Sequence, residues 1–221
     1  MNGWNWDTHE AFVDSLYYSL PAYFKEQFIL ERMEEGAVAP DKTFKDFEDH
    51  SYPAAYHKTN EWLEKMKDAV DHSDWDTASY ALGIASHYLS DSFSAPHNID
   101  GESYDLHRTY EDQGSVTFYF VPCNVTSYDT EELFQNAIAQ GNTWQPWVAS
   151  RDWTYPKNTV QEAMEAVYLI SLGVLDSSCE TKKTHIETAL FSLTFLDYMI
   201  LSFFAGLIVI VAYSIPKHLR K

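Results

Sequence analysis

The sequence predicts a mostly α-helical, single-domain, multi-helix fold followed by one C-terminal transmembrane helix. Its 221 residues suffice for one core and an appendage, whereas two equal domains would be a tight fit. Apolar residues recur at helical spacing through much of the region 7–175. Residues 198–216 form a run of 19 residues without a charged side chain. These three observations define the predicted fold class.

The predicted helices can be placed in order from their breaks. The first is expected from about Asp7 to Tyr23, and Pro21 should end its regular part because proline cannot continue the hydrogen-bond ladder. Residues 36–54 hold glycine, two prolines and alternating aromatic and acidic residues, which indicates an irregular segment. Residues 115–128 are β-prone and predict an extended loop or small hairpin. Further helices are expected at about residues 56–72, 103–113, 129–140 and 158–175.

One more helix, capped by Ser73 or Asp74 and ending near Phe93, carries the most specific pattern. An apolar stripe, which faces the core, includes Ala81, Ile84, Ala85, Tyr88 and Leu89. His87 and Asp91 lie one turn apart on another face. Pro96 breaks the helix, so His97 should arrive from a turn that can point back toward the same cavity.

The C-terminal segment predicts membrane insertion. At about 1.5 Å per residue the uncharged run covers roughly 28 Å, close to the thickness of the hydrocarbon core, although a buried core helix is the alternative. The basic residues that follow should keep the C-terminus in the cytoplasm. With a single membrane span, the main domain would then lie outside the cell. The expected division is a globular domain at 1–176, a stalk at 177–189, a transmembrane helix at 190–216 and a basic cytoplasmic tail at 217–221.

This topology conflicts with the start of the chain. Residues 1–12 have neither the basic region nor the apolar region of a signal peptide. Either the protein is tail-anchored and faces inward, or its precursor begins earlier and is cut. The metal chemistry given below favours the second interpretation.

The composition narrows the range of partners. The formal net charge is -18, and such an acidic surface repels nucleic acid and anionic lipid unless cations are bound locally. Cys123 and Cys179 permit one disulfide at most, and their spacing is not that of a zinc pair. Bound metal ions are one source of local positive charge.

Two His/carboxylate pairs at the same helical spacing indicate a metal site. His87 and Asp91 form one pair, His107 and Glu111 form the other, and His97 lies between them. A single pair of this kind is more often a solvated ion pair, but two pairs and an intervening histidine are much rarer by chance. Imidazole nitrogen and carboxylate oxygen are typical zinc ligands.

The pattern "ASHYLSDSFSAPH" followed by "DLHRTYE" resembles the zinc-dependent phospholipase C family and the related trinuclear zinc single-strand-specific 3′-nucleases. "WNWDTH" also resembles the family, whose mature chains begin with tryptophan and carry a histidine a few residues later. "APD" and "HSYP" look like the remaining Asp and His ligands. The resemblance covers about Trp4 to Glu111 with motifs and implies the family's phospholipase C/nuclease-like fold.

The resemblance implies up to three Zn²⁺ ions. The first would be held by Asp41, His50, His87 and Asp91; the second by His97, His107 and Glu111; and the third by His9, Asp91 and the α-amino group and carbonyl of Trp4. An α-amine is a good ligand and an amide a poor one, so the resemblance implies that Trp4 is the mature N-terminus.

Two ligand assignments stay open. The interval of nine residues between Asp41 and His50 is shorter than the resemblance leads us to expect. Asp46 or Asp49 could therefore replace Asp41, and His57 could replace His50.

The expected function is phospholipase C-type cleavage of phospholipids by a metal-activated hydroxide at a trinuclear zinc site. Asp41 is the candidate general base and Asp91 the bridging catalytic carboxylate. A 3′-nuclease or nucleotidase is the alternative enzyme, although the acidic charge makes nucleic acid a less favoured substrate. A zinc-stabilised surface binding module without catalysis is the alternative from another class.

Overall fold

A computed structural model describes residues 4–114 and 129–175, all of which lie in the unit Met1–Cys179. Within these residues the regular secondary structure is entirely helical, as the sequence predicts. The predicted hairpin, both cysteines, the stalk, the transmembrane helix at 190–216 and the basic tail lie outside the described residues. None of the helices in the described part is long and apolar enough to cross a membrane.

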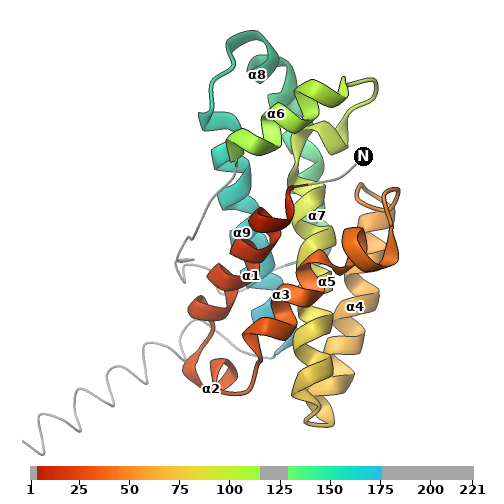
Figure 1. Cartoon of the computed structure of the whole chain (residues 1–221), viewed down its shortest axis with the longest axis vertical. Helices are drawn as coiled ribbons and strands as arrows, with labels where there is room; N and C mark the ends of the chain where they lie inside the picture. Colours follow the sequence, from red (N-terminus) through yellow and green to blue (C-terminus); the bar gives the residue numbers. More distant parts are fainter. Residues whose placement is uncertain (1–3, 115–128, 176–221) are drawn as a thin grey trace, which may run out of the picture. The chain divides into compact units, whose positions relative to one another are not determined.

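Within the described residues the helices follow one another in the order shown in Figure 1. They are α1 (Trp6–Ser19), α2 (Ala22–Lys25), α3 (Leu30–Ala39), the π-helical turn η1 (Pro40–Phe44), α4 (Ala54–Asp71), α5 (Trp75–Phe93), the 3₁₀ turn η2 (Ala95–Asn98), α6 (Tyr104–Gly114), α7 (Thr130–Ala139), η3 (Gln140–Thr143), α8 (Trp144–Ser150) and α9 (Thr154–Val174).

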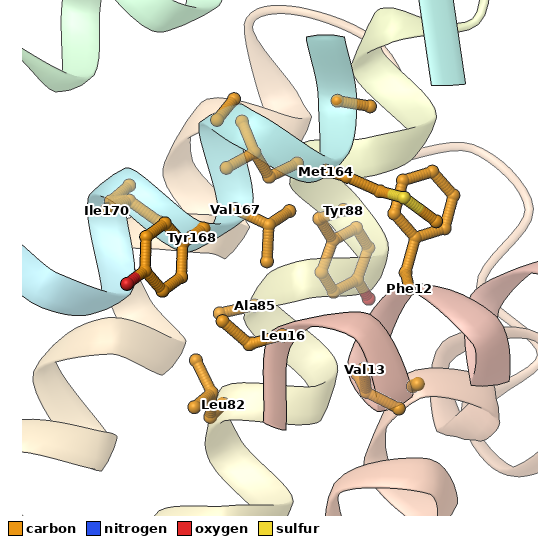
Figure 2. Close-up of a cluster of buried hydrophobic side chains, with 14 of the residues drawn as sticks. Phe12, Val13, Leu16, Leu82, Ala85, Tyr88, Met164, Val167, Tyr168 and Ile170 are labelled. Atoms are coloured by element: carbon orange, nitrogen blue, oxygen red, sulfur yellow. The ribbon is translucent and has the colours of Figure 1, made fainter. Parts of the chain in front are cut away.

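Helix α5 forms the centre of the fold. It packs against α3, α4, α7 and α9, and these neighbours surround it in Figure 1. From Ala78 to Phe93 every residue except Tyr80 is buried, as expected for a helix covered on all sides. Figure 2 shows Leu82, Ala85 and Tyr88 of this helix among apolar side chains of α1 and α9. Polar side chains on α5 are therefore held in a close-packed interior.

Two glycines allow α3 to approach α5 closely. A Cβ atom on Gly36 would lie 2.2 Å from the carbonyl oxygen of Tyr80, and one on Gly83 would lie 2.1 Å from that of Met33. Any larger residue at either position would push the two backbones apart. This contact also explains why glycine occurs inside α3, where it lowers helix propensity.

Most helix boundaries agree with the predictions. Asp74 caps α5 by accepting a hydrogen bond from the Thr77 amide, which decides between the two candidate caps. Pro21 follows the end of α1 directly. The irregular segment predicted from residue 36 was wrong in part, because α3 continues to Ala39. Neither α3 nor the short helix α8 in the connection before α9 was predicted.

Candidate metal centre

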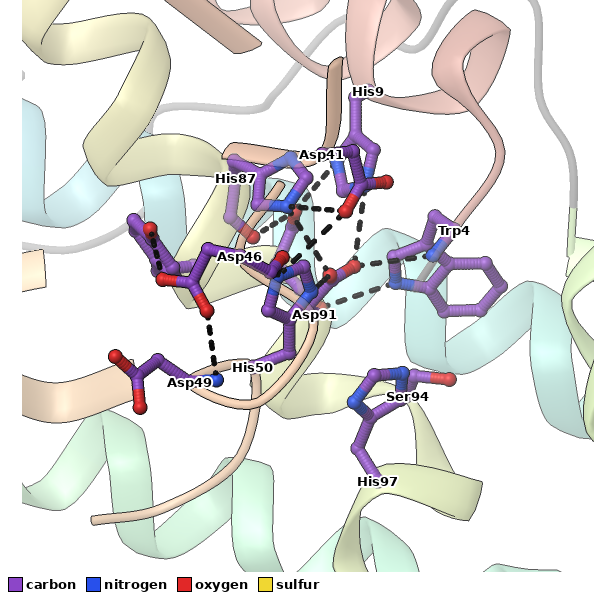
Figure 3. A network of polar contacts seen from close by, with 12 residues as sticks. Trp4, His9, Asp41, Asp46, Asp49, His50, His87, Asp91, Ser94 and His97 are labelled. Carbon is purple, nitrogen blue, oxygen red and sulfur yellow. Dashed lines mark hydrogen bonds and ion pairs between the residues drawn. The ribbon is translucent and has the colours of Figure 1, made fainter. Parts of the chain in front are cut away.

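Side chains that are far apart in the sequence converge at one end of α5 (Figure 3). In each of three groups, one histidine nitrogen or carboxylate oxygen from every member lies within 4.8 Å of those of the others. Every member is buried except His97, which is partly buried. The groups are His9, His87 and Asp91; Asp41, His50 and His87; and His97, His107 and Glu111.

His87 is oriented by the close contact between α3 and α5. Its Nδ1–H donates to the carbonyl of Ala37 at 2.7 Å, one residue after Gly36. This bond leaves Nε2 facing the cluster, 3.4 Å from Asp91 Oδ2 and 4.0 Å from Asp41 Oδ1. Burial and the neighbouring histidines hold the pKa of His87 well below its usual range. A neutral ring with a free nitrogen is the form that binds metal.

Asp91 lies at the centre of the cluster and is fully buried. Its Oδ1 accepts the main-chain N–H of Trp4 at 3.1 Å and lies 3.3 Å from His9 Nε2, while Oδ2 lies 2.6 Å from His50 Nδ1. Burial alone would raise the pKa of this carboxyl, but the surrounding histidines hold it well below its usual range. Asp91 is therefore a carboxylate with different partners on its two oxygens.

His50 is held between two acceptors. Its Nε2–H donates to the carbonyl of Asp46 at 2.7 Å, and Nδ1 faces Asp91. Burial lowers the pKa of His50, yet the contact with Asp91 outweighs it and raises the pKa to about 9. A cation at Nδ1 would have to replace that proton.

The structure separates the alternative ligands in the 41–57 segment. Asp41 is buried on η1 and its Oδ1 lies 3.7 Å from His50 Nε2. Asp46 instead stabilises the loop, accepting hydrogen bonds from two main-chain amides and from the Tyr88 hydroxyl. Asp49 pairs with Lys58, and His57 is exposed. Asp41 and His50 are thus the members of this segment that reach the cluster.

The third group is assembled by η2 and α6. His97 Nε2 lies 3.4 Å and His107 Nε2 3.0 Å from Glu111 Oε1. The hydroxyl of Ser94 donates to the same oxygen at 2.9 Å. Because Pro96 sits in the first turn of η2, His97 leaves the direction of α5, as the sequence predicts.

The turn that carries His97 is held by an asparagine that the sequence does not single out. Asn98 Nδ2 lies within hydrogen-bond distance of three main-chain carbonyls, those of Ser92, Ser94 and Ala137. Through Ala137 this side chain also joins the turn to α7.

The donor atoms fit a set of metal ions. His9 Nε2, His87 Nε2, His97 Nε2 and both Asp41 carboxylate oxygens are buried and have no hydrogen-bond partner within the described residues. Buried polar atoms are rarely left unpaired because desolvation without a partner costs about 1–3 kcal/mol each. Imidazole and carboxylate are the ligands that zinc takes, and a cation between them would satisfy these atoms.

The structure differs from the sequence-based ligand sets in one detail. His87 belongs to two groups, with His9 and Asp91 as well as with Asp41 and His50, and its ring stacks on that of His9 at 4.0 Å. His87 Nδ1 is hydrogen-bonded to the carbonyl of Ala37, so only Nε2 is available to a metal. His87 can therefore bind one ion and not one in each group. The main-chain nitrogen of Trp4 lies beside Asp91, next to His9 as the resemblance implies.

A pocket of about 440 Å³ gives access to part of this cluster. Asp41, His107 and Glu111 line it, together with the side chains of Trp6, Tyr104 and Arg108. Asp91 is not among the lining residues. Of the two candidate catalytic carboxylates, Asp41 therefore faces the space available to a substrate, and Asp91 lies beneath it.

Of three comparisons with known proteins, one found a match, and it agrees with this geometry. No curated protein and no solved structure matches the chain. The family model described as "Zinc dependent phospholipase C" matches residues 8–161, which is more than half of the chain and includes every member of the three groups. The protein therefore belongs to the zinc-dependent phospholipase C family.

Proposed function

We propose that the protein cleaves phospholipids by phospholipase C-type hydrolysis at a trinuclear zinc site. The observation that carries the proposal is the pocket lined by Asp41, His107 and Glu111, with unpaired ligand atoms buried beside it. Family membership supports a zinc-dependent hydrolase and a phospholipid substrate.

The three groups support the following assignment of ligands. Asp41, His50 and His87 with Asp91 would hold one zinc, and His97, His107 and Glu111 a second. His9, Asp91 and the main-chain nitrogen and carbonyl of Trp4 would hold the third. Three Zn²⁺ would bring six positive charges against the three carboxylates Asp41, Asp91 and Glu111, an excess that attracts phosphate to an otherwise acidic protein.

The side chains around the proposed zinc site would have separate roles in the reaction. Bound zinc supplies a Lewis acid and lowers the pKa of a coordinated water. Asp41 faces the pocket and is placed to accept a proton from the attacking water. Asp91 would bridge two of the ions, because its two oxygens face different histidines, His9 and His50. Trp6 and Tyr104 present apolar surface to the substrate, and Arg108 is paired with Asp112 at the same wall.

A 3′-nucleotidase or nuclease is the second candidate. The aromatic side chains of Trp6 and Tyr104 at the pocket favour it, because aromatic rings stack on nucleobases. The net charge of -18 disfavours long nucleic acid, so a mononucleotide is the better substrate in this class.

The test is a metal count combined with a substrate comparison. Protein beginning at Trp4 and protein retaining Met1, Asn2 and Gly3 are assayed on phosphatidylcholine, single-stranded DNA and a 3′-nucleotide. We expect close to three zinc per chain and lipid hydrolysis in the first protein, and a weaker third zinc in the second. Fewer than two zinc per chain would refute the trinuclear site. Full zinc without turnover of any substrate would indicate a zinc-stabilised binding module.

We also propose that residues 190–216 anchor the protein in the cell membrane with the catalytic domain outside and the C-terminus cytoplasmic. The uncharged run and the basic residues after it support this proposal. Protease added to intact cells should cleave the catalytic domain and spare a tag at the C-terminus. Cleavage of the tag alone would indicate the reverse orientation.

A further inference from the structure

A second acid, partly buried, lies on the far side of the His107 ring from Glu111. Glu102 stands two residues before α6, and its Oε1 lies 3.4 Å from His107 Nδ1. The two side chains are only 6% and 4% exposed. On the opposite edge of the ring, His107 Nε2 lies 3.0 Å from Glu111 Oε1. One ring is therefore contacted by a carboxylate at each nitrogen.

These two carboxylates have different roles. Glu111 shares its position with His97 and His107 in the candidate zinc group, whereas Glu102 is not a member of that group. The two ring nitrogens point in different directions, so a carboxylate beside Nδ1 cannot also bind an ion at Nε2. Glu102 is thus placed to accept the Nδ1–H bond and not to ligate the same ion.

Two of the other cluster histidines show the same arrangement with weaker acceptors. His87 donates from Nδ1 to the carbonyl of Ala37, and His50 donates from Nε2 to the carbonyl of Asp46. His107 has a charged carboxylate at the corresponding place. Burying a carboxylate is costly unless it is paired, so this choice of acceptor calls for a reason beyond packing.

We propose that Glu102 is a positioning residue for His107. It accepts the hydrogen bond from Nδ1–H, fixes the tautomer in which Nε2 is unprotonated, and directs Nε2 toward His97 and Glu111. A carboxylate acceptor also makes the imidazole a stronger donor to zinc. This inference rests on the proposed function, in which His97, His107 and Glu111 hold zinc.

The test uses Glu102→Ala and Glu102→Gln in the full chain, with Asp100→Ala as the matched control. Asp100 is an exposed acid in the same loop. Zinc retention is measured against a graded series of chelator concentrations. Loss of such a partner weakens metal affinity by about 10–100-fold. We expect Glu102→Ala to lose one zinc equivalent at a chelator concentration about 10–100-fold lower than the wild type does. Glu102→Gln should retain zinc almost normally, because its amide oxygen still accepts the hydrogen bond.

A second readout follows the ring itself. In a Glu111→Ala background, which removes the closer acceptor at Nε2, nitrogen-15 chemical shifts of His107 in the zinc-free protein at pH 9 should show a proton on Nδ1 with Glu102 intact and in Glu102→Gln. In Glu102→Ala they should show a mixture of the two tautomers. A purely structural role for Glu102 would change the melting temperature without changing this ratio.

The outcomes separate the inference from the proposed function. If the wild type binds zinc and Glu102→Ala retains it as Asp100→Ala does, the role of Glu102 is refuted and the zinc site stands. Equal loss of every zinc equivalent from Glu102→Ala would also refute it. If the wild type binds no zinc, the proposed function is refuted. The tautomer ratio then still decides whether Glu102 orients the ring.

Discussion

Replacing Gly83 with alanine tests whether the contact between α3 and α5 builds the metal centre. The new Cβ would lie 2.1 Å from Met33 O and 2.8 Å from Ala37 N, both main-chain atoms that cannot rotate away. Real Cβ contacts are essentially never under 3.0 Å, so the helices must separate by about 0.9 Å, the difference between 3.0 and 2.1. Overpacking of this kind costs about 1–3 kcal/mol.

The same displacement should reach the ligand one turn along α5. Added to the 2.7 Å bond between His87 Nδ1 and Ala37 O, it gives about 3.6 Å, which is too long for a hydrogen bond. Gly83→Ala should therefore lose zinc affinity as well as stability. Urea unfolding of the zinc-free protein, followed by circular dichroism, measures the first effect, and chelator competition measures the second.

The control for Gly83→Ala is Leu63→Ala on α4. Leu63 is buried, and its truncation leaves a cavity that costs about 2–5 kcal/mol without adding any atom between α3 and α5. It should reduce stability at least as much and leave zinc affinity unchanged. If Gly83→Ala changes the unfolding free energy by less than about 0.5 kcal/mol, or retains zinc as the control does, the reasoning is wrong.

Three further results are expected. Asp91→Asn removes the central charge, so zinc content should fall by at least one ion per chain, and chelator should lower the melting temperature by less than it does in the wild type; unchanged zinc would contradict the bridging role. Asn98→Asp turns a donor to three carbonyls into an acceptor and should cost about 2–3 kcal/mol, more than Asn98→Ala, in urea unfolding. Burial and the neighbouring Asp14 raise the pKa of Glu34 to about 6. The folded state therefore binds the proton more tightly, and stability declines as pH rises from about 4.5 to 6. Glu34→Gln should be more stable than the wild type at pH 7 by up to about 1 kcal/mol, since Glu34 is partly exposed and solvent screens its charge, with no difference below pH 4; equal stability at both pH values would refute this.

The helical part of the site could be predicted because it depends on local geometry. His87 and Asp91 lie on one face of α5, and His107 and Glu111 on one face of α6, since residues four apart are neighbours on any α-helix. The redirection of His97 followed equally from the fixed backbone of Pro96. These relations do not depend on the rest of the fold.

The segment from 30 to 57 shows where local reasoning fails. Glycine at position 36 lowers the helix propensity of α3. Its advantage is the close approach to Gly83 on α5, which the sequence alone does not show. Asp41, Asp46 and Asp49 have the same side chain within nine residues, and only the path of η1 and the following loop decides which reaches the histidines. No periodicity distinguishes them.

By itself, then, the sequence determined an α-helical protein with two His/carboxylate pairs and the family to which it belongs. Only the tertiary structure decided that Asp41 joins His50 and that His87 stands between two groups. It alone shows that Ala37 and Glu102 contact the rings of His87 and His107, and that Asn98 contacts the turn that carries His97. The physical reason is range: helical spacing acts over four residues, whereas hydrogen bonds such as that from His87 to Ala37 join residues fifty positions apart.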